Sequence, residues 1–274
     1  MLVKIHQNKV FNIKYNFLRF FPYCNKIQIY KKMNTDNQNQ ESVQKPEWDE
    51  NLGIWKNSKA AGQSTLPDPL WIFGYGSLCY KPGDMKYVEE RNGYIKHYTR
   101  RFWQKSCDHR GTPENPGLVC TLLSEEEWQT YGDNYENGIV YGKVFRIDEK
   151  DKEEVLNELD FREKGGYSQI ILDVYFQDFD ENQSGNQVQK VQALLYKGNV
   201  DNPNFLQDKD IRGCIKKQAE IISKSIGPSG KNIEYLIKYY QYLQSIDKVD
   251  RYMEELVQLA TQVISSDQDS CSKS

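Results

Sequence analysis

The spacing of apolar residues changes once along this 274-residue chain, and that change limits the possible fold more than any other feature. Between residues 70 and 196, short runs rich in β-branched and aromatic residues are separated by glycine, proline and polar residues, which is typical of β-strands. From Ile211 onward, apolar residues recur every three or four positions, as in amphipathic helices. Strands followed by helices predict an α+β fold with a curved or closed sheet.

The individual elements follow from the same patterns. Strands are predicted at 70–75, 93–104, 117–123, 139–147, 168–176 and 190–196. Between the predicted strands at 139–147 and 168–176, a helix is expected to start at an Asp148 cap and to reach about Leu159. Later helices are predicted over 211–226, from about Asn232, and over about 248–264, and residues 178–189 are typical of an exposed hairpin loop.

The first 66 residues do not share this pattern. Residues 33–50 are rich in Asn, Gln, Asp and Glu and cannot bury enough apolar surface to order themselves. We therefore expect 1–66 to be a disordered or non-core extension, 67–265 to be one domain and 266–274 to be a flexible tail. Residues 1–32 carry lysines and Arg19 but no acidic residue, which is compatible with a mitochondrial transit peptide. They lack the usual richness in arginine and serine, so a cytoplasmic protein is the main expectation and a mitochondrial one the alternative.

Composition argues against several classes of function. The net charge of −3 does not suit a nucleic-acid binder, and no run approaches the ~18 apolar residues of a transmembrane helix. The six cysteines form no C-x-x-C pair, and with three histidines no zinc constellation can be drawn. We expect reduced thiols, no metal, no nucleic-acid or membrane partner, and a monomer or weak dimer.

A turn with two glycines follows the first predicted strand, in Phe73-Gly74-Tyr75-Gly76-Ser77-Leu78. It is not a dinucleotide or Walker motif, because Cys79 stands where G-x-G-x-x-G needs glycine and no G-K-[ST] follows. It is not a nucleophile elbow either, because Tyr75 and Cys79 replace both glycines of G-x-S-x-G. The turn could still direct backbone N–H groups at a carboxylate or an oxyanion, and an ordinary β-turn is the alternative.

A second informative stretch, Asp160–Tyr167, reads DFREKGGY and follows the predicted helix. Gly165 and Gly166 allow a loop to turn tightly, and a carboxylate held at such a turn can transfer protons. Glu163 is the candidate carboxylate. The alternative is a solvated surface glutamate, since glutamate is rarely fully buried.

Neighbouring charges compete with Glu163 or flank it. Asp160 and Glu158 are the other carboxylates, and Glu158 is the weaker because it falls on the polar face of the helix. Arg162 and Lys164 are expected to flank Glu163 on the solvent side.

Two further possibilities stay open on spacing alone. Cys107 and His109 could form a nucleophilic pair, but residues so close in one loop seldom reach in-line geometry. Tyr235 could pack in the core from its helix or present its hydroxyl to a site.

Six segments, spread over roughly residues 70–260, are informative when they are taken in order. They are Trp71–Leu78 (WIFGYGSL), Arg100–Gln104 (RRFWQ), Asp108–Gly111 (DHRG), Leu159–Tyr167 (LDFREKGGY), Asp201–Leu206 (DNPNFL) and Gly227–Leu236 (GPSGKNIEYL). In this order they resemble the ChaC-type glutathione-specific γ-glutamylcyclotransferases, and most closely their ChaC2-like branch.

The resemblance implies a fold, a reaction and a site. The fold is γ-glutamylcyclotransferase-like: a curved or closed mixed β-barrel with surrounding helices and a helical C-terminal part. The activity is that of a carbon–nitrogen lyase, which converts glutathione to 5-oxo-L-proline and L-cysteinylglycine without cofactor or metal. Glu163 matches the catalytic glutamate. The residues that match the substrate-binding positions are Ile72, Phe73, Gly74, Tyr75, Gly76, Ser77 and Tyr235.

The chain departs locally from the family pattern. Cys79-Tyr80 replaces an Ile/Trp-like pair, and an acidic insertion lies near Glu125–Asn137.

Two alternative functions would also involve γ-glutamyl ligands. One is a cyclotransferase for other γ-glutamyl amino acids or amines, and the other is a non-catalytic module that binds γ-glutamyl ligands. A nucleotide-binding domain is disfavoured by the failed glycine spacing.

Overall fold

The computed structural model describes residues 47–49, 54–56, 58–59, 66–135, 138–163, 167–177 and 189–271. All of these belong to one compact unit, Ser42–Ser274. The other unit, Met1–Glu41, lies outside the described residues, as does most of the extension expected over 1–66.

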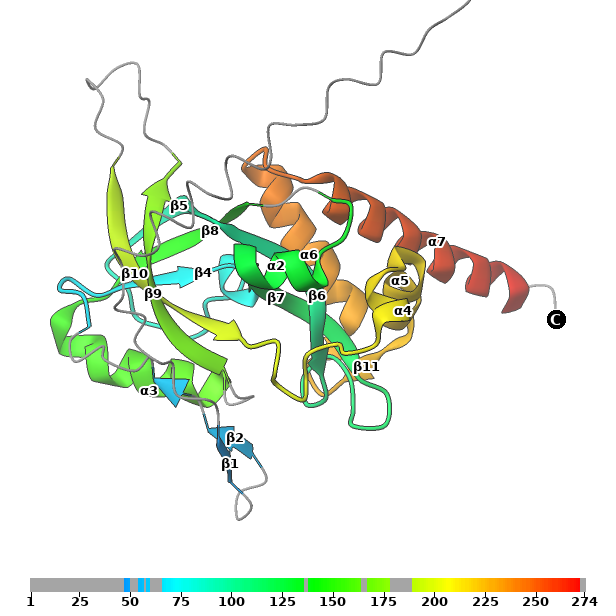
Figure 1. Cartoon of the computed structure of the whole chain (residues 1–274), viewed down its shortest axis with the longest axis horizontal. Coiled ribbons are helices and arrows are strands. Elements are labelled where there is room, and N and C mark those ends of the chain that lie inside the picture. The colour runs from blue at the N-terminus through cyan, green and yellow to red at the C-terminus, as the bar shows by residue number, and fades with distance from the viewer. Residues whose placement is uncertain are drawn as a thin grey trace, which may run out of the picture. The chain divides into compact units, whose positions relative to one another are not determined.

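The described elements alternate between strands and helices before a helical C-terminal part (Figure 1). In chain order they are β1 (Glu47–Asp49), β2 (Ile54–Lys56), β3 (Ser58–Lys59), β4 (Trp71–Gly74), η1 (Ser77–Cys79), β5 (Glu89–Lys96), β6 (Tyr98–Ser106), β7 (Gly117–Ser124), α2 (Glu125–Tyr131), β8 (Ile139–Arg146), η2 (Glu149–Asp151), α3 (Lys152–Arg162), β9 (Tyr167–Phe176), β10 (Lys190–Gly198), α4 (Lys209–Arg212), α5 (Ile215–Lys224), β11 (Ile226–Gly227), β12 (Gly230–Lys231), α6 (Asn232–Ser245) and α7 (Arg251–Cys271).

Five strands close into a mixed barrel in the order β10-β4-β8-β5-β9, because β9 also pairs with β10. The β4–β10 pairing is parallel and the other four are antiparallel. Gly93 lies where β5 pairs with both β8 and β9, and a Cβ there would lie 2.9 Å from the Tyr175 carbonyl oxygen. A glycine at that position therefore lets β5 bend between its two neighbours. The expected closed sheet is confirmed.

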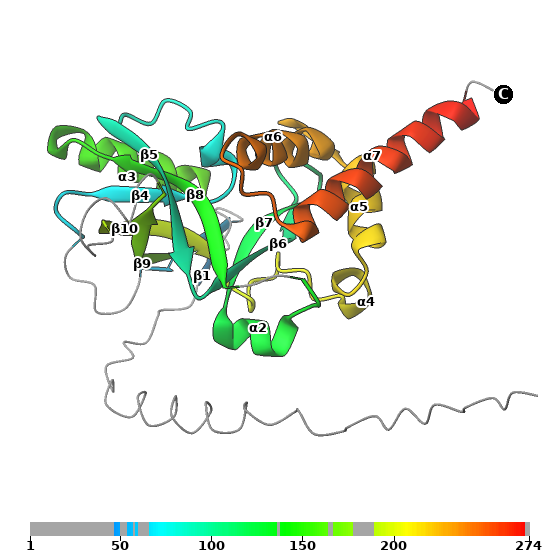
Figure 2. The same ribbon diagram turned by 90° about the horizontal axis from the view of Figure 1, so that it is seen from above.

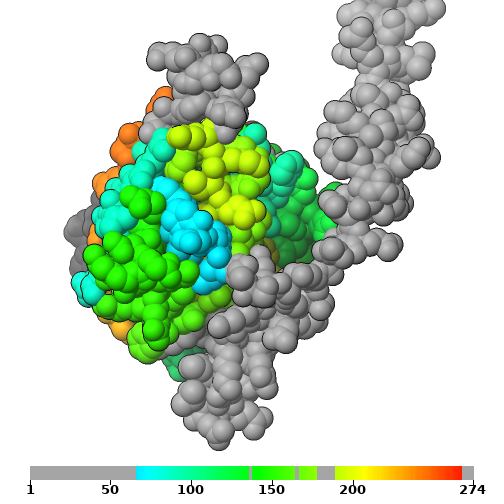
Figure 3. Space-filling view, turned by 90° about the vertical axis from the view of Figure 1, so that its left-hand side faces the viewer, coloured from blue at the N-terminus to red at the C-terminus, as the bar shows by residue number. Residues whose placement is uncertain are grey.

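Helices cover the barrel on two sides. α3 lies on one side, and α4, α5, α6 and α7 gather on the other (Figures 1 and 2). On α3, the buried Val155 and Leu159 are one helical turn apart and pack with Ile72 and Phe145. Burial of each such side chain contributes roughly 1.5–3 kcal/mol. From the α3 side, the chain that enters β4 (cyan) lies between α3 (green) and β10 (yellow-green) (Figure 3).

A separate ribbon of β6 and β7 joins the barrel to the C-terminal helices. It has a register shift between Arg101 and Gln104. Buried Phe102 and Trp103 from this ribbon share one core with Leu236 and Tyr239 of α6 and with Leu256 of α7. This packing places α6 against η1, where β4 ends.

Most predicted elements are confirmed, and three are corrected. The strand expected over 93–104 is two strands, because His97 adopts a left-handed φ of 66° between them. The helix expected over 211–226 divides into α4 and α5, and Ile226 falls in β11. The last helix begins at Arg251 and ends at Cys271, beyond the expected 264.

Even α7, at 21 residues the longest helix in the described part of the chain, lacks the apolar run that a membrane crossing requires. Within the same residues, no three His, Cys, Asp or Glu side chains come together as a metal-ion site would need. The four cysteines whose side chains are described, Cys79, Cys107, Cys120 and Cys214, are free thiols.

Candidate active site

The turn after β4, residues 75–77, is fixed by two neighbouring strands. The hydroxyl of the buried Tyr75 donates a hydrogen bond to the Tyr196 carbonyl oxygen on β10, at 2.6 Å. The Cys120 thiol on β7 donates to the Tyr75 carbonyl oxygen, at 3.6 Å. η1 follows directly, and no hydrogen-bond acceptor among the described residues is recorded for the Ser77 and Leu78 amides at its start. The turn is held by hydrogen bonds to two strands and retains backbone donors for a ligand.

Tyr235 from α6 lies against this turn. A Cβ on Gly76 would lie 3.0 Å from the Tyr235 hydroxyl oxygen, so glycine permits the close approach. The Cys120 amide donates to that hydroxyl at 3.4 Å, and the rings of Tyr80 and Phe102 meet the Tyr235 ring edge-on. Burial raises the pKa of Tyr235 well above its ordinary value, so the hydroxyl stays protonated at neutral pH.

Glu163 ends α3, where its amide donates to the Leu159 carbonyl oxygen at 2.9 Å. Its half-buried carboxylate has no hydrogen-bond or ion-pair partner among the residues that the structure describes. Burial raises the pKa of Glu163, the Arg162 charge opposes this rise, and the Asp108 charge adds to it. A desolvated carboxylate without a fixed partner is suited to accept a proton from a ligand.

Electrostatics connects Glu163 with the turn. Burial raises the pKa of Tyr75, and the charges of Tyr167 and Glu163 raise it further. Burial also raises the pKa of Tyr167, with Glu163 the next largest cause. Glu163, Tyr75 and Tyr167 therefore share one low-dielectric region, in which charges interact more strongly than in water.

Asp160 has a structural role that distinguishes it from Glu163. Its Oδ1 accepts hydrogen bonds from the Tyr196 hydroxyl and the Gln169 side-chain amide, both at 2.7 Å. These bonds attach the end of α3 to β9 and β10, one helical turn before Glu163. Glu158, the other competitor, lies half-buried near Gly83, with its Oε1 3.4 Å from where a Cβ would be built.

The prediction that Arg162 faces solvent is wrong. Its guanidinium donates to the Pro82 carbonyl oxygen at 2.9 Å, the Lys81 carbonyl oxygen at 3.4 Å and Ser77 Oγ at 3.5 Å. Arg162 thus connects the end of α3 to the segment that follows the turn. Lys164, the other expected flanking residue, lies outside the described residues together with Gly165 and Gly166.

The structure does not join Cys107 and His109 as a nucleophilic pair. His109 Nδ1 lies 3.2 Å from Ser229 Oγ, and Cys107 Sγ lies 4.0 Å from Asn204 Oδ1. Burial raises the pKa of the Cys107 thiol, which reduces its thiolate fraction.

The structure brings most of the predicted site residues together, with one difference. Gly74, Tyr75, Gly76, Ser77 and Tyr235 meet at the turn. The side chains of Ile72 and Phe73 are buried in the core, 0% and 1% exposed, so only their backbone can contribute to a site.

Sequence reasoning missed three residues around the turn: Cys120, Tyr167 as a site residue, and Tyr196. Tyr167 closes the Asp160–Tyr167 stretch, but nothing in that stretch predicts that its side chain reaches the turn. No local motif marks Cys120 or Tyr196, because they reach the turn from two other strands. Tyr80 was noted only as a departure from the family pattern.

Comparisons with known proteins identify the family. The family model described as ChaC-like protein matches residues 70–263, so the chain belongs to the ChaC-like protein family. The glutathione-specific gamma-glutamylcyclotransferase of Schizosaccharomyces pombe is 36% identical over 182 residues, which are 65% of this chain and 84% of that protein. The Danio rerio glutathione-specific gamma-glutamylcyclotransferase 1 is 36% identical over 207 residues, 73% of this chain and 92% of that protein.

The fold agrees as well. The crystal structure of a yeast γ-glutamyl cyclotransferase specific to glutathione superimposes with a TM-score of 0.61 at 29% identity, covering 70% of this chain and 96% of that one. The closed mixed barrel with a helical C-terminal part is therefore the γ-glutamylcyclotransferase-like fold that the resemblance implied.

Proposed function

We propose that this protein cleaves glutathione by cyclising its γ-glutamyl group, with Glu163 as the proton-transfer group. The reaction gives 5-oxo-L-proline and L-cysteinylglycine, so the protein is a carbon–nitrogen lyase of glutathione catabolism. The similarity to glutathione-specific gamma-glutamylcyclotransferases supports glutathione as the substrate. The observation that carries the role of Glu163 is its half-buried carboxylate, whose pKa burial raises and which has no partner among the described residues.

The chemistry needs little beyond positioning and one base. The α-amine of the substrate attacks its own γ-carbonyl carbon, and because the nucleophile is tethered, effective molarities can reach about 10⁵ M or more. The ammonium form cannot attack, so Glu163 first takes a proton from it. When the tetrahedral intermediate collapses, the amide C–N bond breaks and Glu163 returns its proton to the departing nitrogen. The ring nitrogen loses its second proton to the departing amine, which leaves as an ammonium. No water is consumed.

The turn supplies the second requirement. In this proposal the Gly76 and Ser77 amides stabilise the substrate carboxylate or the developing oxyanion. The close approach of the Tyr235 hydroxyl to Gly76 supports this role of the turn. Loss of one oxyanion donor typically costs about 2.7–4 kcal/mol in the transition state.

The direct test is Glu163→Gln, which keeps the shape of the side chain and removes the base. Released cysteinylglycine and 5-oxoproline are identified by mass, with glutathione and several γ-glutamyl amino acids as substrates. We expect the rate with glutathione to fall by about 10²- to 10⁴-fold. Glu158→Gln is the matched control and should retain most activity. Near wild-type turnover in Glu163→Gln would remove Glu163 from this role, and preferred release of free amino acids would assign a different γ-glutamyl substrate.

Finer assignments belong to the same proposal. They are the slower ChaC2-like branch, the cytoplasm with mitochondria as the alternative, a monomer or weak dimer, and a catalytic domain over 67–265. Several relatives are glutathione-specific gamma-glutamylcyclotransferases 1. The turnover rate, measured side by side with such an enzyme, tests whether this protein belongs to the slower ChaC2-like branch. Gel filtration decides the oligomeric state.

A further inference from the structure

One cavity of the described residues lies away from Glu163. It is a groove of about 720 Å³ between the C-terminal half of α6, the strands β5 and β8, and the exit of η1. None of Glu163, Tyr235 or residues 75–77 lines it. Both the groove and the candidate active site lie next to η1, but the residues of the candidate active site do not line the groove. η1 itself lies between the end of β4 and α6 (Figures 1 and 2).

The walls of the groove are cationic. Lys81, Arg91, Lys143 and Lys238 line it, against one carboxylate, Glu90. The excess of positive charge is local, because the whole chain has a net charge of −3. A concave surface lined by one sign of charge concentrates small ions of the opposite sign.

Two of these cations are available to a ligand. Lys143 pairs with Glu90, and Arg91 donates to Gln189 Oε1 at 3.2 Å. For Lys81 and Lys238, both exposed, no carboxylate partner is recorded within the described residues. Lys81 follows η1 and Lys238 lies on α6, so the two ammonium groups reach the groove from different elements.

The floor of the groove is neutral. The buried Tyr242 donates its hydroxyl to Asn92 Oδ1 at 3.3 Å, and Ser245 Oγ donates to the Tyr242 carbonyl oxygen at 2.6 Å. Burial raises the pKa of the Cys79 thiol, so the floor adds no negative charge at neutral pH. Pockets of about 300–1,000 Å³ are the usual size for small ligands.

We propose that this groove binds a small polyanion, a ligand that carries two or more phosphoryl or carboxylate groups. Lys81 and Lys238 bind its charged groups from two different elements, and Asn92, Gln241 and Ser245 supply neutral hydrogen-bond partners. Charge-assisted hydrogen bonds from lysine are the interactions that such a ligand requires.

Calorimetric titration at constant ionic strength tests the proposal, with pyrophosphate and citrate as probes. The two probes separate a phosphoryl from a carboxylate source. We expect at least one to bind with a Kd near or below about 1 mM. The double variant Lys81→Gln/Lys238→Gln should raise that Kd at least about tenfold, because two charge-assisted contacts are lost.

A matched control removes the same charge elsewhere. Lys216 and Lys217 are exposed on α5 and do not line the groove, so Lys216→Gln/Lys217→Gln should leave the Kd within about twofold. Unchanged thermal melting and glutathione turnover confirm that both double variants fold. Equal weakening in the two double variants, or no binding of either probe to the wild type, overturns the proposal.

One measurement separates the groove from the substrate site. Titration of the probe into Glu163→Gln protein saturated with glutathione should give the wild-type Kd. Displacement of the probe by glutathione, together with a probe Kd that Lys81→Gln/Lys238→Gln leaves unchanged, would place the probe in the substrate site and overturn the proposal. Calorimetry measures binding of the probe directly. The result therefore does not depend on whether the protein turns over glutathione.

Discussion

Glu163 combines two properties that seldom occur together: partial burial, and the absence of a protein partner among the described residues. Asp160, three residues earlier, is held by two hydrogen bonds and has little capacity left for a ligand. The difference arises from position on α3. Asp160 faces β9 and β10, whereas Glu163 is the first residue past the helix. At the scale of single residues, the site therefore depends on which carboxylate the local structure leaves unpaired.

The raised pKa of Glu163 predicts the acid limb of the pH–rate profile. A general base works only when deprotonated, so kcat/KM should rise with pH through the pKa of Glu163. Because burial raises that pKa, the limb should lie above the ordinary glutamate value of about 4.3. Steady-state rates from pH 4 to 8 measure it. Glu158→Gln should leave the limb in place, and a limb at the ordinary value would contradict the burial argument.

The same shift predicts a change in stability. The pKa of Glu163 is higher in the folded protein than in the unfolded chain, so the protonated carboxyl stabilises the fold. This contribution is complete at pH values below the unfolded-state pKa. It is lost as the pH rises through the folded-state pKa. Glu163→Gln mimics the protonated form. Its Tm should therefore exceed that of the wild type at pH 7, and the gain should shrink toward pH 4. A gain that is the same at both pH values would show that packing, not charge, is responsible.

Gly76 predicts a steric effect. A methyl group there would lie 3.0 Å from the Tyr235 hydroxyl, which is tighter than most real contacts, so the turn or the tyrosine must shift. Misplacement by about 1 Å can reduce catalysis about 10²-fold, and Gly76→Ala should lose activity on this scale with little change in Tm. Gly213→Ala, at the end of α4, serves as control. Wild-type kcat/KM in Gly76→Ala would mean that this approach is not needed.

At the scale of elements, hydrophobic alternation predicted β4, β7, β8, β9 and β10 because each strand is bounded by turn residues. It joined β5 and β6 because the alternating pattern continues through His97, where only the left-handed φ separates them. It missed α2, although Ser124 and Glu127 form a capping box that the sequence contains. A signal of this kind can be read from sequence, whereas the φ of His97 cannot.

The position of Arg162 could not be predicted from local sequence. Its acceptors at Lys81 and Pro82 lie about 80 residues away in the chain. Charged residues in a row are normally solvated, and only the tertiary fold brings backbone carbonyls to this guanidinium. The same limit applies to Tyr196, which reaches Tyr75 from β10.

Arg162 predicts two effects of one substitution. Arg162→Ala releases the segment after the turn, so the KM for glutathione should rise several-fold, by about 1–2 kcal/mol in binding. Because the Arg162 charge lowers the pKa of Glu163, its loss should also move the acid limb to higher pH. Lys152→Ala, at the other end of α3, should do neither. A KM increase without movement of the limb would separate the structural role from the electrostatic one.

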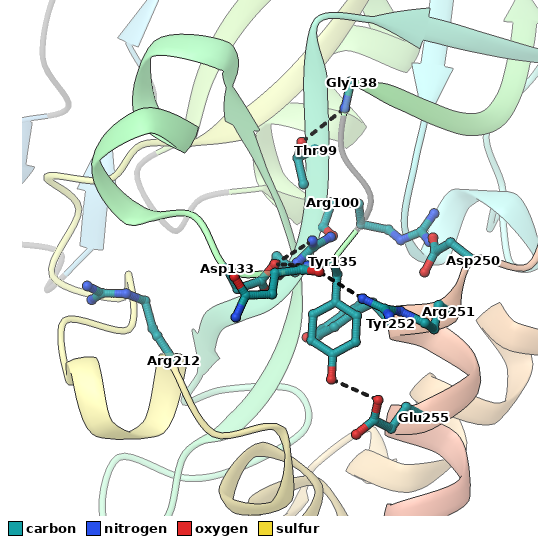
Figure 4. Close-up of polar contacts among 12 residues, drawn as sticks. Thr99, Arg100, Asp133, Tyr135, Gly138, Arg212, Asp250, Arg251, Tyr252 and Glu255 are labelled. Atoms are coloured by element: carbon teal, nitrogen blue, oxygen red, sulfur yellow. Dashed lines mark hydrogen bonds and ion pairs between the residues drawn. The ribbon is translucent and has the colours of Figure 1, made fainter. Parts of the chain in front are cut away.

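At the scale of the whole molecule, the β6–β7 ribbon and the C-terminal helices are joined by a polar cluster that includes part of the acidic insertion (Figure 4). Arg100 pairs with Asp250, and Arg101 binds Asp133 through two hydrogen bonds of 2.8 Å. Tyr135 donates to Glu255 at 2.9 Å. The segment after α2 thus connects β6 with α7, and this connection also supports α6, which carries Tyr235.

The Arg101–Asp133 pair predicts how strongly that connection stabilises the fold. Arg101 is only 2% exposed, so Asp133→Asn removes a counter-charge that pairs with this buried guanidinium. Breaking a buried pair in this way costs about 3–5 kcal/mol. The exposed Lys190–Asp173 pair is the matched control, since Asp173→Asn should cost at most about 1 kcal/mol. Urea denaturation of both variants measures the free energy of unfolding. Equal small losses would mean that the Trp128 and Tyr252 rings stacked near Arg101 hold it without Asp133.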